Sequence, residues 1–599
     1  MGRCFLPQST SARVGEVMLD LSVLIPARNE EFLDRTIKSV LEASEADTEV
    51  IVVLDGQGSV TPLEQHPKVK VVYLPESIGQ RAATNLAAKL STAKYIMKLD
   101  AHCILGQGFD RILIEAHEPG MTQIPRLYNL HAFNWKCKEC GDETYQGPMP
   151  TECIKPDMDK ISDAFKQGVD KIKGVSYNRG NPSTGVEAKK DIPKEYRANC
   201  PSTDFERVIV WAPRDGKAVP EKRVSDFWRF DHTLHFQYWR EYGKRAEGQG
   251  DICDVFGNLG ACWFMERERY WEIDGLDEDH GSWGQMGVEI SCKTWLSGGR
   301  QVVNKKTWFS HLFRTQGGTF GFPYPQSAKG VDEARKHSRE LWMNNTWDKQ
   351  VHRLPWLLER FHPPDWPSKS ILYYTDSKLD VRIANVVRGQ INKAELPIRS
   401  VSLEPLNWGN NISLDMRPGA LTMFKQILAG LEASTADIIF FCEHDVLYHP
   451  SHFDFIPERE DVYYYNLNIW KVDATGEHRP LHYDCKQTSG LCAYREFLIT
   501  HYKERIRRVE ADRYYNWMGF EPGTHNRDDK EDGRLGRVDK FGSETWRSQT
   551  PNIDIRHRQN LTNTRWDKSQ FRNAISCRNW ERADQVPGWP DIKEIIRGY

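Results

Sequence analysis

The feature that most constrains this chain is an apolar run that ends in an acid and an imidazole, residues 95–105 (YIMKLDAHCIL). The apolar residues predict a buried strand, and Asp100 and His102 follow it directly. Side chains two positions apart in an extended segment point to the same side, so this pair can share one divalent cation. Ligands bind at the carboxyl ends of strands in open α/β sheets. The stretch therefore predicts a metal site at a sheet edge, and a capped strand end with a surface histidine is the alternative.

Strand-like and helix-like segments alternate around this run. Short apolar blocks indicate strands and apolar residues at helical spacing indicate helices. The segments are, in order, residues 19–25, 32–43, 50–54, 69–74, 81–90 and 95–99. This order predicts a doubly wound α/β sheet. Polar residues follow three of the strands, at residues 28–30, at Asp55 and at Asp100, and we expect them to meet in one crevice.

Length and composition set broader limits. A chain of 599 residues exceeds what one hydrophobic core usually holds, so we expect at least two domains. Lys and Arg number 81 against 84 Asp and Glu, and this balance does not indicate nucleic acid or an anionic membrane as partner. No apolar run approaches the roughly 20 residues of a membrane span, and the amino terminus lacks a signal-peptide core. We therefore expect a cytoplasmic protein. The pattern indicates no oligomeric state.

A series of motifs carries a resemblance to a known family. They are IPARNE at 25–30, VVLDG at 52–56, LDAHC at 99–103, a small-residue strand and G-x-D turn from Gly257, WFSHLFR at 308–314 and RELWMN at 339–344. The series resembles the GT-A-fold glycosyltransferases of the family-2 type, and LDAHC resembles the motif of the polypeptide N-acetylgalactosaminyltransferases. The resemblance covers about residues 19–115 and 255–345. It implies a GT-A fold, Rossmann-like with a mostly parallel sheet, and a nucleotide-sugar donor, UDP-linked.

The resemblance also implies a site. A nucleotide-sugar leaves a diphosphate behind, and this anion needs a Lewis acid. Asp100, His102 and His311 would bind the cation, and mixed carboxylate and imidazole ligands suit Mn²⁺ better than Mg²⁺. The implied donor-binding residues are Pro26, Arg28, Glu30 and Asp55 toward the base and ribose, Arg81 and Arg314 toward the phosphates, and Trp283 in the Trp-Gly loop. Solvated or salt-bridged side chains are the alternative for the arginines.

The expected catalytic residues are Glu289, an acid near the acceptor, and Asp100, a ligand of the metal. The family pattern is Trp-Gly-Gly-Glu-Asn-x-Glu, and here the first of its two glutamates is replaced by Met286. This departure leaves the donor sugar and the anomeric outcome open. Glu289 could be a general base for inversion or could bind the sugar in a retaining reaction. The alternative is an acid at a helix amino terminus, favoured by the helix dipole.

The two blocks of resemblance are separated by an insertion, about residues 116–255, that contains clustered cysteines. Cys137 and Cys140 form a Cys-x-x-Cys pair, and Cys153 follows nearby. This spacing predicts a structural zinc knuckle within residues 131–153, with His131 or Cys200 as the fourth ligand. Free thiols on a loop are the alternative.

After the Pro-rich stretch at 363–367 the pattern starts again. The segments FKQILAGLEASTADIIFFCEHDVL and ATNLAAKLSTAKYIMKLDAHCIL align as helix, Ser-Thr-Ala, strand and acid-x-ligand. We therefore expect a second, diverged GT-A-like domain at 363–599 after a first at 1–362. Glu443, Asp445 and His557 are its possible metal ligands. The alternative to an active second site is a domain that only binds the acceptor or supports the architecture.

Together these patterns predict a metal-dependent glycosyltransferase that moves a sugar from a nucleotide-sugar to a hydroxyl acceptor. The acceptor could be a saccharide, a protein or a hydroxymethylated base of viral DNA, and basic patches near the carboxyl terminus fit either a solvated face or a DNA groove. A nucleotidyltransferase is an alternative, but IPARNE lacks the Gly of a phosphate loop. An inactive scaffold that binds sugar or nucleic acid is the other alternative.

Overall fold

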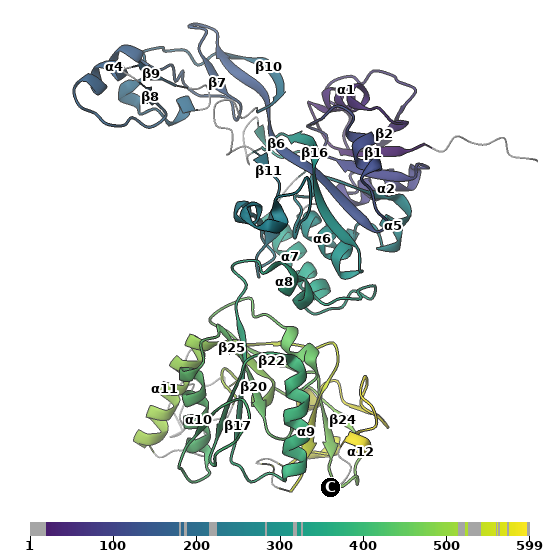
Figure 1. Cartoon of the computed structure of the whole chain (residues 1–599), viewed down its shortest axis with the longest axis vertical. Coiled ribbons are helices and arrows are strands. Elements are labelled where there is room, and N and C mark those ends of the chain that lie inside the picture. Colours follow the sequence, from purple (N-terminus) through teal and green to yellow (C-terminus); the bar gives the residue numbers. More distant parts are fainter. Residues whose placement is uncertain are drawn as a thin grey trace, which may run out of the picture. The chain divides into compact units, whose positions relative to one another are not determined.

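The computed structural model divides the chain into two compact units (Figure 1). The structure describes residues 19–178, 181–184, 188–214, 224–281, 284–314, 320–324, 327–512, 521–524, 541–558, 560, 563–571 and 574–595. The first unit comprises Met1–Phe230, Phe236–Ser338 and Lys349–His352, and the remainder forms the second. Arg339–Asp348 and the helix α8 (Leu354–Phe361) thus group with the second unit. The expected boundary between two domains at residues 362–363 stays a prediction.

The first unit is built on a mixed, mainly parallel sheet. Its main path runs β14-β16-β6-β15-β4-β1-β2-β3. The strands are β1 (Leu21–Ala27), β2 (Thr48–Asp55), β3 (Val69–Leu74), β4 (Tyr95–Leu99), β6 (Met121–Cys137), β14 (Ile252–Asp254), β15 (Cys262–Glu266) and β16 (Arg300–His311). The strand β1 pairs in parallel with both β2 and β4, so the residues that follow β1 and β4 emerge at one edge.

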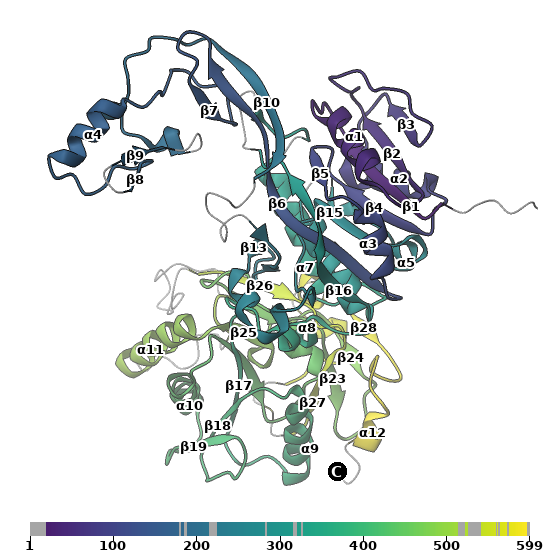
Figure 2. The ribbon, with the colours of Figure 1, turned by 45° about the horizontal axis from the view of Figure 1, so that its top comes forward.

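Near-continuous runs of Val, Ile and Leu explain why these strands lie inside. All residues of β1, β2 and β4 are buried, as expected for parallel strands covered on both faces. The helices α1 (Leu33–Ala43) and α2 (Gln80–Leu90) pack on the sheet (Figure 2). The Thr36 hydroxyl of α1 donates to the Ala101 carbonyl at 3.0 Å, which ties the helix to the segment after β4. The remaining helices are α3 (Phe109–Glu115), α5 (Arg267–Glu272), α6 (Met286–Leu296) and α7 (Ala328–Trp342).

The insertion, expected at about residues 116–255, continues directly from a strand of the core sheet. The first part of β6 pairs with β16 in the core sheet, from Met121 to Asn129. The same strand continues into a second sheet, where it pairs with β7 (Glu143–Tyr145) and β10 (Phe205–Pro213). Beyond these lie α4 (Met158–Lys166) and the hairpin of β8 (Ser176–Asn178) and β9 (Asn181–Ser183) (Figure 1). The insertion is therefore joined to the core by continuous backbone pairing.

The second unit repeats the strand order of the first. Its sheet runs β19-β18-β17-β20-β25-β22-β26, matching β3-β2-β1-β4-β15-β6 over the first six strands. In both sheets the first four strands of this series are parallel, and the next strand is antiparallel. The elements are β17 (Lys369–Thr375), α9 (Val381–Ile391), β18 (Ile398–Ser402), β19 (Asn410–Ser413), α10 (Ala420–Ala433), β20 (Ile438–Glu443), β22 (Tyr463–Asn466), β25 (Leu491–Tyr494), α11 (Arg495–Asp512) and β26 (Ser543–Trp546). The expected α/β class is confirmed in both units.

Alternation along β17 explains the two cores of the second unit. Ile371 and Tyr373 belong to one buried cluster, and Leu372 and Tyr374 belong to another, because successive side chains leave a strand on opposite faces. A second, five-stranded sheet completes the unit, with β21 (Val446–Leu447), β27 (Asn552–Arg556), β23 (Ile469–Asp473), β24 (Leu481–His482) and β28 (Glu581–Arg582) in that order.

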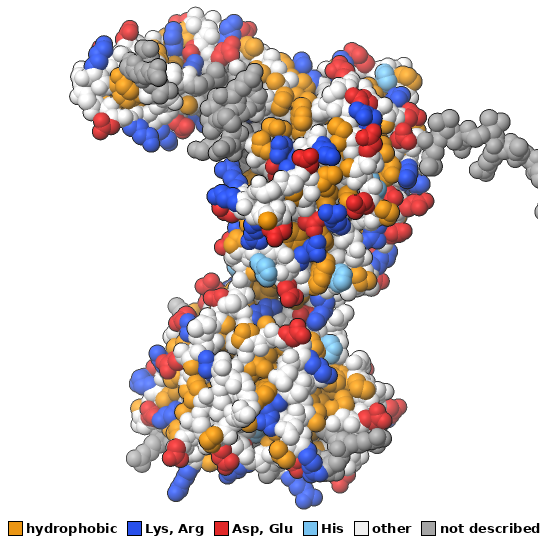
Figure 3. Space-filling model, in the orientation of Figure 1, with side chains coloured by type: hydrophobic (Ala, Val, Ile, Leu, Met, Phe, Trp, Pro, Cys, Tyr) orange, Lys and Arg blue, Asp and Glu red, His pale blue; other side chains and the backbone are white. Residues whose placement is uncertain are grey.

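The surface mixes both signs of charge. Figure 3 shows acidic and basic side chains interspersed over the visible face, in keeping with a formal net charge of −3. Among the residues that the structure describes, no helix combines the length and the apolarity needed to cross a membrane.

We predict that Gly287→Ala destabilises the first unit by about 1–3 kcal/mol, because overpacking forces backbone to move. A Cβ at Gly287 in α6 would lie 1.9 Å from the Asn258 carbonyl oxygen. Thermal unfolding should show the loss. Gly389→Ala in α9 is the control, since nothing lies within 4 Å of its Cβ position, and it should gain about 0.5–1 kcal/mol. Equal midpoints for Gly287→Ala and the parent chain would contradict this close approach.

Candidate active site

A cavity of about 310 Å³ lies at the carboxyl ends of β1 and β4. The segment after β1 contributes residues 26–28 and Glu30, and β4 leads into Asp100 and His102. Other walls come from residues 258–261, the start of α6, residues 311–314 and residues 322–324. The cavity thus occupies the place where α/β sheets usually bind ligands.

Strand pairing brings the three expected metal ligands together. The short strand β5 (Cys103–Leu105) pairs antiparallel with β16, so His311 lies opposite Cys103 and beside His102. The two Nε2 atoms are 3.2 Å apart, and His311 Nε2 is 3.1 Å from Asp100 Oδ2. One oxygen and two nitrogens therefore converge within 4.8 Å of one another. Two donors about 2.1 Å from one ion, at right angles, are about 3 Å apart, so the set fits a divalent cation.

The protonation states of this group favour cation binding. Burial lowers the pKa of His311 to about 4, which keeps its imidazole neutral with a free lone pair. Burial by itself would raise the pKa of Asp100, but Lys98 and His311 outweigh it and hold the pKa below its usual range. A carboxylate and a neutral imidazole are the forms that ligate metals.

Glu30 orients the His102 ring. Its Oε2 lies 2.9 Å from His102 Nδ1, and its Oε1 accepts from the Phe32 backbone at 3.0 Å and from Arg314. Burial opposes ionisation of Glu30, yet His102 and Arg314 lower its pKa overall. A carboxylate on Nδ1 directs the Nε2 lone pair toward the cavity, as in many metal sites.

Lys98 and Gln80 also contact the site, and the sequence reasoning missed both. Lys98 is buried and pairs with Asp100 Oδ1, while it donates to the Gly260 carbonyl at 2.8 Å. Gln80 donates to the same carboxylate oxygen at 3.1 Å. Lys98 stands two residues before Asp100 on a strand, so period-two alternation could have placed it on the same face.

The expected donor-binding residues divide into two groups. Pro26, Arg28, Glu30 and Arg314 line the cavity. Asp55 does not, because its carboxylate accepts from the Ser77 hydroxyl and from the Ile78 and Gly79 backbone, at 2.6–3.0 Å, and so caps the turn before α2. Trp283 lies outside the described residues.

Glu289 and Arg81 form a buried ion pair instead of reaching the cavity. The Arg81 Nε lies 3.1 Å from Glu289 Oε2, and Lys293 Nζ lies 2.9 Å from Oε1. Glu289 also accepts from the Asp277 backbone at 2.6 Å and is fully buried. Arg81 donates further to the Gly281 and Gly284 carbonyls. Both side chains are thus paired inside the fold, as the salt-bridge alternative expects for Arg81. The catalytic role of Glu289 and the phosphate contact of Arg81 stay predictions, and neither residue lines the cavity.

Met286, which replaces the first glutamate of the family pattern, does line the cavity. An apolar thioether thus stands where the resemblance places a carboxylate. The wall at the start of α6 is less polar than the family pattern implies.

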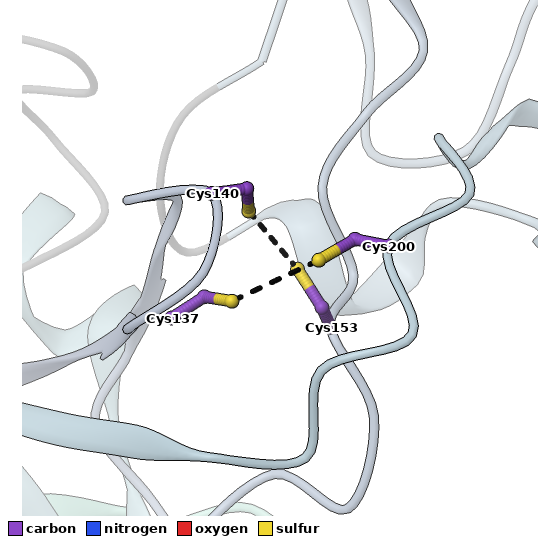
Figure 4. A group of neighbouring side chains, drawn as sticks. All are labelled: Cys137, Cys140, Cys153 and Cys200. Atoms are coloured by element: carbon purple, nitrogen blue, oxygen red, sulfur yellow. Dashed lines mark hydrogen bonds between the residues drawn. The ribbon is translucent and has the colours of Figure 1, made fainter.

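The predicted zinc ligands lie in the insertion, and the structure distinguishes the two candidates for the fourth position. Cys137, Cys140 and Cys153 come together with Cys200, not with His131 (Figure 4). The His131 Nε2 instead hydrogen-bonds Asn134 Oδ1 at 2.6 Å.

The second unit does not assemble the expected metal set. Asp445 Oδ2 lies 3.2 Å from His557 Nε2, but the same oxygen accepts from the Asn560 amide at 2.7 Å. Glu443 accepts from the Tyr374 hydroxyl at 2.7 Å. Within the described residues, no group of three ligand atoms closes around Glu443, Asp445 and His557. Glu443 and Asp445 line a cavity of about 680 Å³ together with Lys471 and Arg556. His557 is not part of its wall.

Comparison with known proteins bears on the first unit. Residues 22–126 match the model of the glycosyl transferase family 2. This stretch is therefore similar to family 2 glycosyltransferases, and the match covers less than a fifth of the chain. The matched residues include Glu30, Asp100 and His102. His311 lies outside the matched region.

The matched stretch and its surroundings are similar to named transferases. Human polypeptide N-acetylgalactosaminyltransferase 10 is 24% identical over 370 residues, covering 58% of this chain and 46% of the relative. The probable N-acetylgalactosaminyltransferase 9 of Caenorhabditis elegans is 27% identical over 124 residues, 19% of this chain and 21% of the relative. The chain thus spans less than half the length of these curated relatives. A crystal structure of GalNAc-T7 with UDP, GalNAc and Mn²⁺ aligns over 59% of each chain, with 14% identity and a TM-score of 0.37.

We predict that Glu289→Gln acts on stability. Arg81 and Lys293 would remain buried without their anion, at a cost of about 3–5 kcal/mol in the free energy of unfolding. Denaturant titration should show this loss, whereas Glu268→Gln on α5, at an exposed position, should be neutral. Unchanged stability with a selective loss of turnover would restore the catalytic interpretation of Glu289.

We also predict a pH signature in the second unit. Burial and the neighbouring Asp445 raise the pKa of Glu443 from 4.5 to about 8, so the folded unit binds the extra proton. Between these values the folded state holds more protons than the unfolded state, and stability therefore falls as pH rises from about 4.5 to about 8. The unfolding temperature of the Glu443→Gln variant should therefore depend less on pH across this range. The Glu432→Gln variant should keep the pH dependence of the parent chain. Parallel pH profiles for Glu443→Gln and the parent chain would refute the assignment.

Proposed function

We propose that the first unit transfers a sugar from a nucleotide-sugar to a hydroxyl acceptor, using a divalent cation held by Asp100, His102 and His311. The single observation that carries this proposal is the convergence of the three ligand atoms in a cavity at the carboxyl edge of a family 2 domain. Mn²⁺ fits one carboxylate and two imidazoles better than Mg²⁺ does. When bound, the ion supplies a Lewis acid that stabilises the diphosphate leaving group.

The remaining cavity residues prepare the site for an anion. Arg28 and Arg314 line the cavity, and buried Lys98 adds a positive charge next to Asp100. These cations favour a phosphate-bearing donor, because Arg presents a rigid fork of donors to phosphate oxygens. Glu30 holds both the His102 ring and Arg314, and so couples the metal ligand to a candidate phosphate contact.

The similarity to named transferases suggests which donor sugars and acceptors to test first. The relatives are named as N-acetylgalactosaminyltransferases, which makes UDP-linked hexoses and N-acetylhexosamines the first donors to test. Met286 in the cavity wall favours a sugar contact without the carboxylate of the family pattern. A protein or saccharide hydroxyl is the acceptor that this similarity supports first, and a hydroxymethylated DNA base is tested beside them.

We predict that Asp100→Ala abolishes cation-dependent cleavage of the donor while the fold survives. A panel of nucleotide-sugars, incubated with Mn²⁺ and no acceptor, should identify one that the parent chain hydrolyses. Loss of a direct ligand should lower this rate more than the roughly 10–100-fold loss in affinity or activity that follows loss of a group orienting a ligand. Glu30→Gln should fall within that smaller range.

The control is Glu64→Ala, which removes an exposed carboxylate that does not line the cavity and should leave the rate unchanged. Circular dichroism should be the same for all three variants. Parent-level hydrolysis by Asp100→Ala would remove the assigned site, and hydrolysis insensitive to chelation would remove the cation from the proposal.

A further inference from the structure

The four sulfur atoms of the insertion have the arrangement of a closed tetrahedral metal site. Cys137 Sγ lies 3.9 Å from Cys200 Sγ, and Cys140 Sγ lies 3.5 Å from Cys153 Sγ. All four lie within 4.8 Å of one another, and the side chains point toward a common centre (Figure 4). Zinc bonds sulfur at about 2.3 Å, so a tetrahedron of thiolates has sulfur atoms about 3.8 Å apart.

The four ligands come from separate stretches of backbone that hydrogen bonds hold in place. Cys137 ends β6, and Cys140 lies in the following turn, where the Gly141 amide donates to the Cys137 carbonyl at 2.9 Å. Cys153 and Cys200 lie on two loops, and the Cys153 amide donates to the Ser202 carbonyl at 3.2 Å. A bound ion would therefore close the base of the segment that carries α4 and the β8–β9 hairpin.

The cluster is largely shielded from solvent. Cys137 and Cys153 are buried, and Cys140 and Cys200 are half-buried. Cationic metal is what stabilises several thiolates at such short separations. With four protein ligands no position stays open for a substrate, so the site is structural.

Two of the cysteines share a buried apolar cluster with residues adjacent to the candidate active site. Cys137 and Cys153 belong to one buried cluster with Phe32, Phe133 and Leu312. Phe32 lies two residues after Glu30, and Leu312 directly follows His311.

Two further contacts join the insertion to the same loop. The ring of Phe32 stacks on Trp211 of β10 at 5.2 Å, and Arg207 of β10 pairs with Glu31. The Arg207 guanidinium also lies over the Phe133 ring, 4.7 Å from its centroid. The insertion sheet therefore supports the backbone on which Glu30 stands.

We propose that Cys137, Cys140, Cys153 and Cys200 bind one zinc ion, and that this ion holds the insertion sheet against the loop carrying Glu30. The zinc site is independent of the transferase proposal. Its second role, positioning Glu30 and through it His102, rests on the proposed function of the first unit.

The zinc site is tested on the full chain as purified. Elemental analysis should find about one zinc per chain, resistant to dialysis and released when thiols are modified. Replacement by Co²⁺ should give the intense thiolate-to-cobalt absorption of a tetrahedral sulfur site. A Cys140→Ser/Cys153→Ser double variant should lose the zinc, and Cys577→Ser, outside the cluster, should retain it. Absence of zinc together with two disulfides, Cys137–Cys200 and Cys140–Cys153, would overturn the proposal, and so would zinc retained by the double variant.

The positioning role is tested by Mn²⁺ binding, followed through the signal of free Mn²⁺ in electron paramagnetic resonance. Zinc loss should weaken Mn²⁺ affinity about 10–100-fold, as expected when a group that orients a ligand is disturbed, while the Glu443-dependent pH profile of the second unit stays the same. Equal Mn²⁺ affinity with and without zinc would overturn the positioning role alone. Absence of Mn²⁺ binding by the parent chain would instead count against the proposed function and leave the zinc site standing.

Discussion

The short antiparallel pairing of β5 with β16 is the constraint on which the candidate site depends. It places His311, which comes from the far end of a long strand, next to the two ligands that follow β4. Without that pairing the chain would hold an Asp-x-His pair with two ligand atoms. Burial then sets the chemistry, because it keeps the His311 imidazole neutral while Lys98 keeps Asp100 ionised. Backbone register and local electrostatics thus define one site together.

Several parts of this site follow from sequence patterns because their signals are local. Asp100 and His102 stand after an apolar strand, and their two-residue spacing fixes their common direction. Clustered cysteines at Cys-x-x-Cys spacing likewise predict a metal site in the insertion. The alternation of strand and helix patterns predicts the α/β class in both halves, and the structure agrees.

Other parts did not follow because they depend on contacts between distant residues. Glu289 has the residue type and helix position of an active-site acid, but its pairing with Arg81 and Lys293 is visible only when α2 and α6 are packed together. Asp55 is similar, since the turn before α2 consumes its oxygens. Cys200 is far from the other cysteines along the chain, and only the path of the insertion distinguishes it from His131 as the fourth ligand. Residue type indicates what a side chain can do, and packing decides what it does.

The two units share one strand order but differ at the carboxyl ends of their strands. The first unit has two facing imidazoles there, whereas in the second the Asp445 carboxylate faces the His557 imidazole and the Asn560 amide. A scaffold whose stability comes from its own sheet and two apolar layers tolerates drift at its rim. Side chains at the strand ends of the second unit can therefore change while the three candidate ligands of the first unit stay in place.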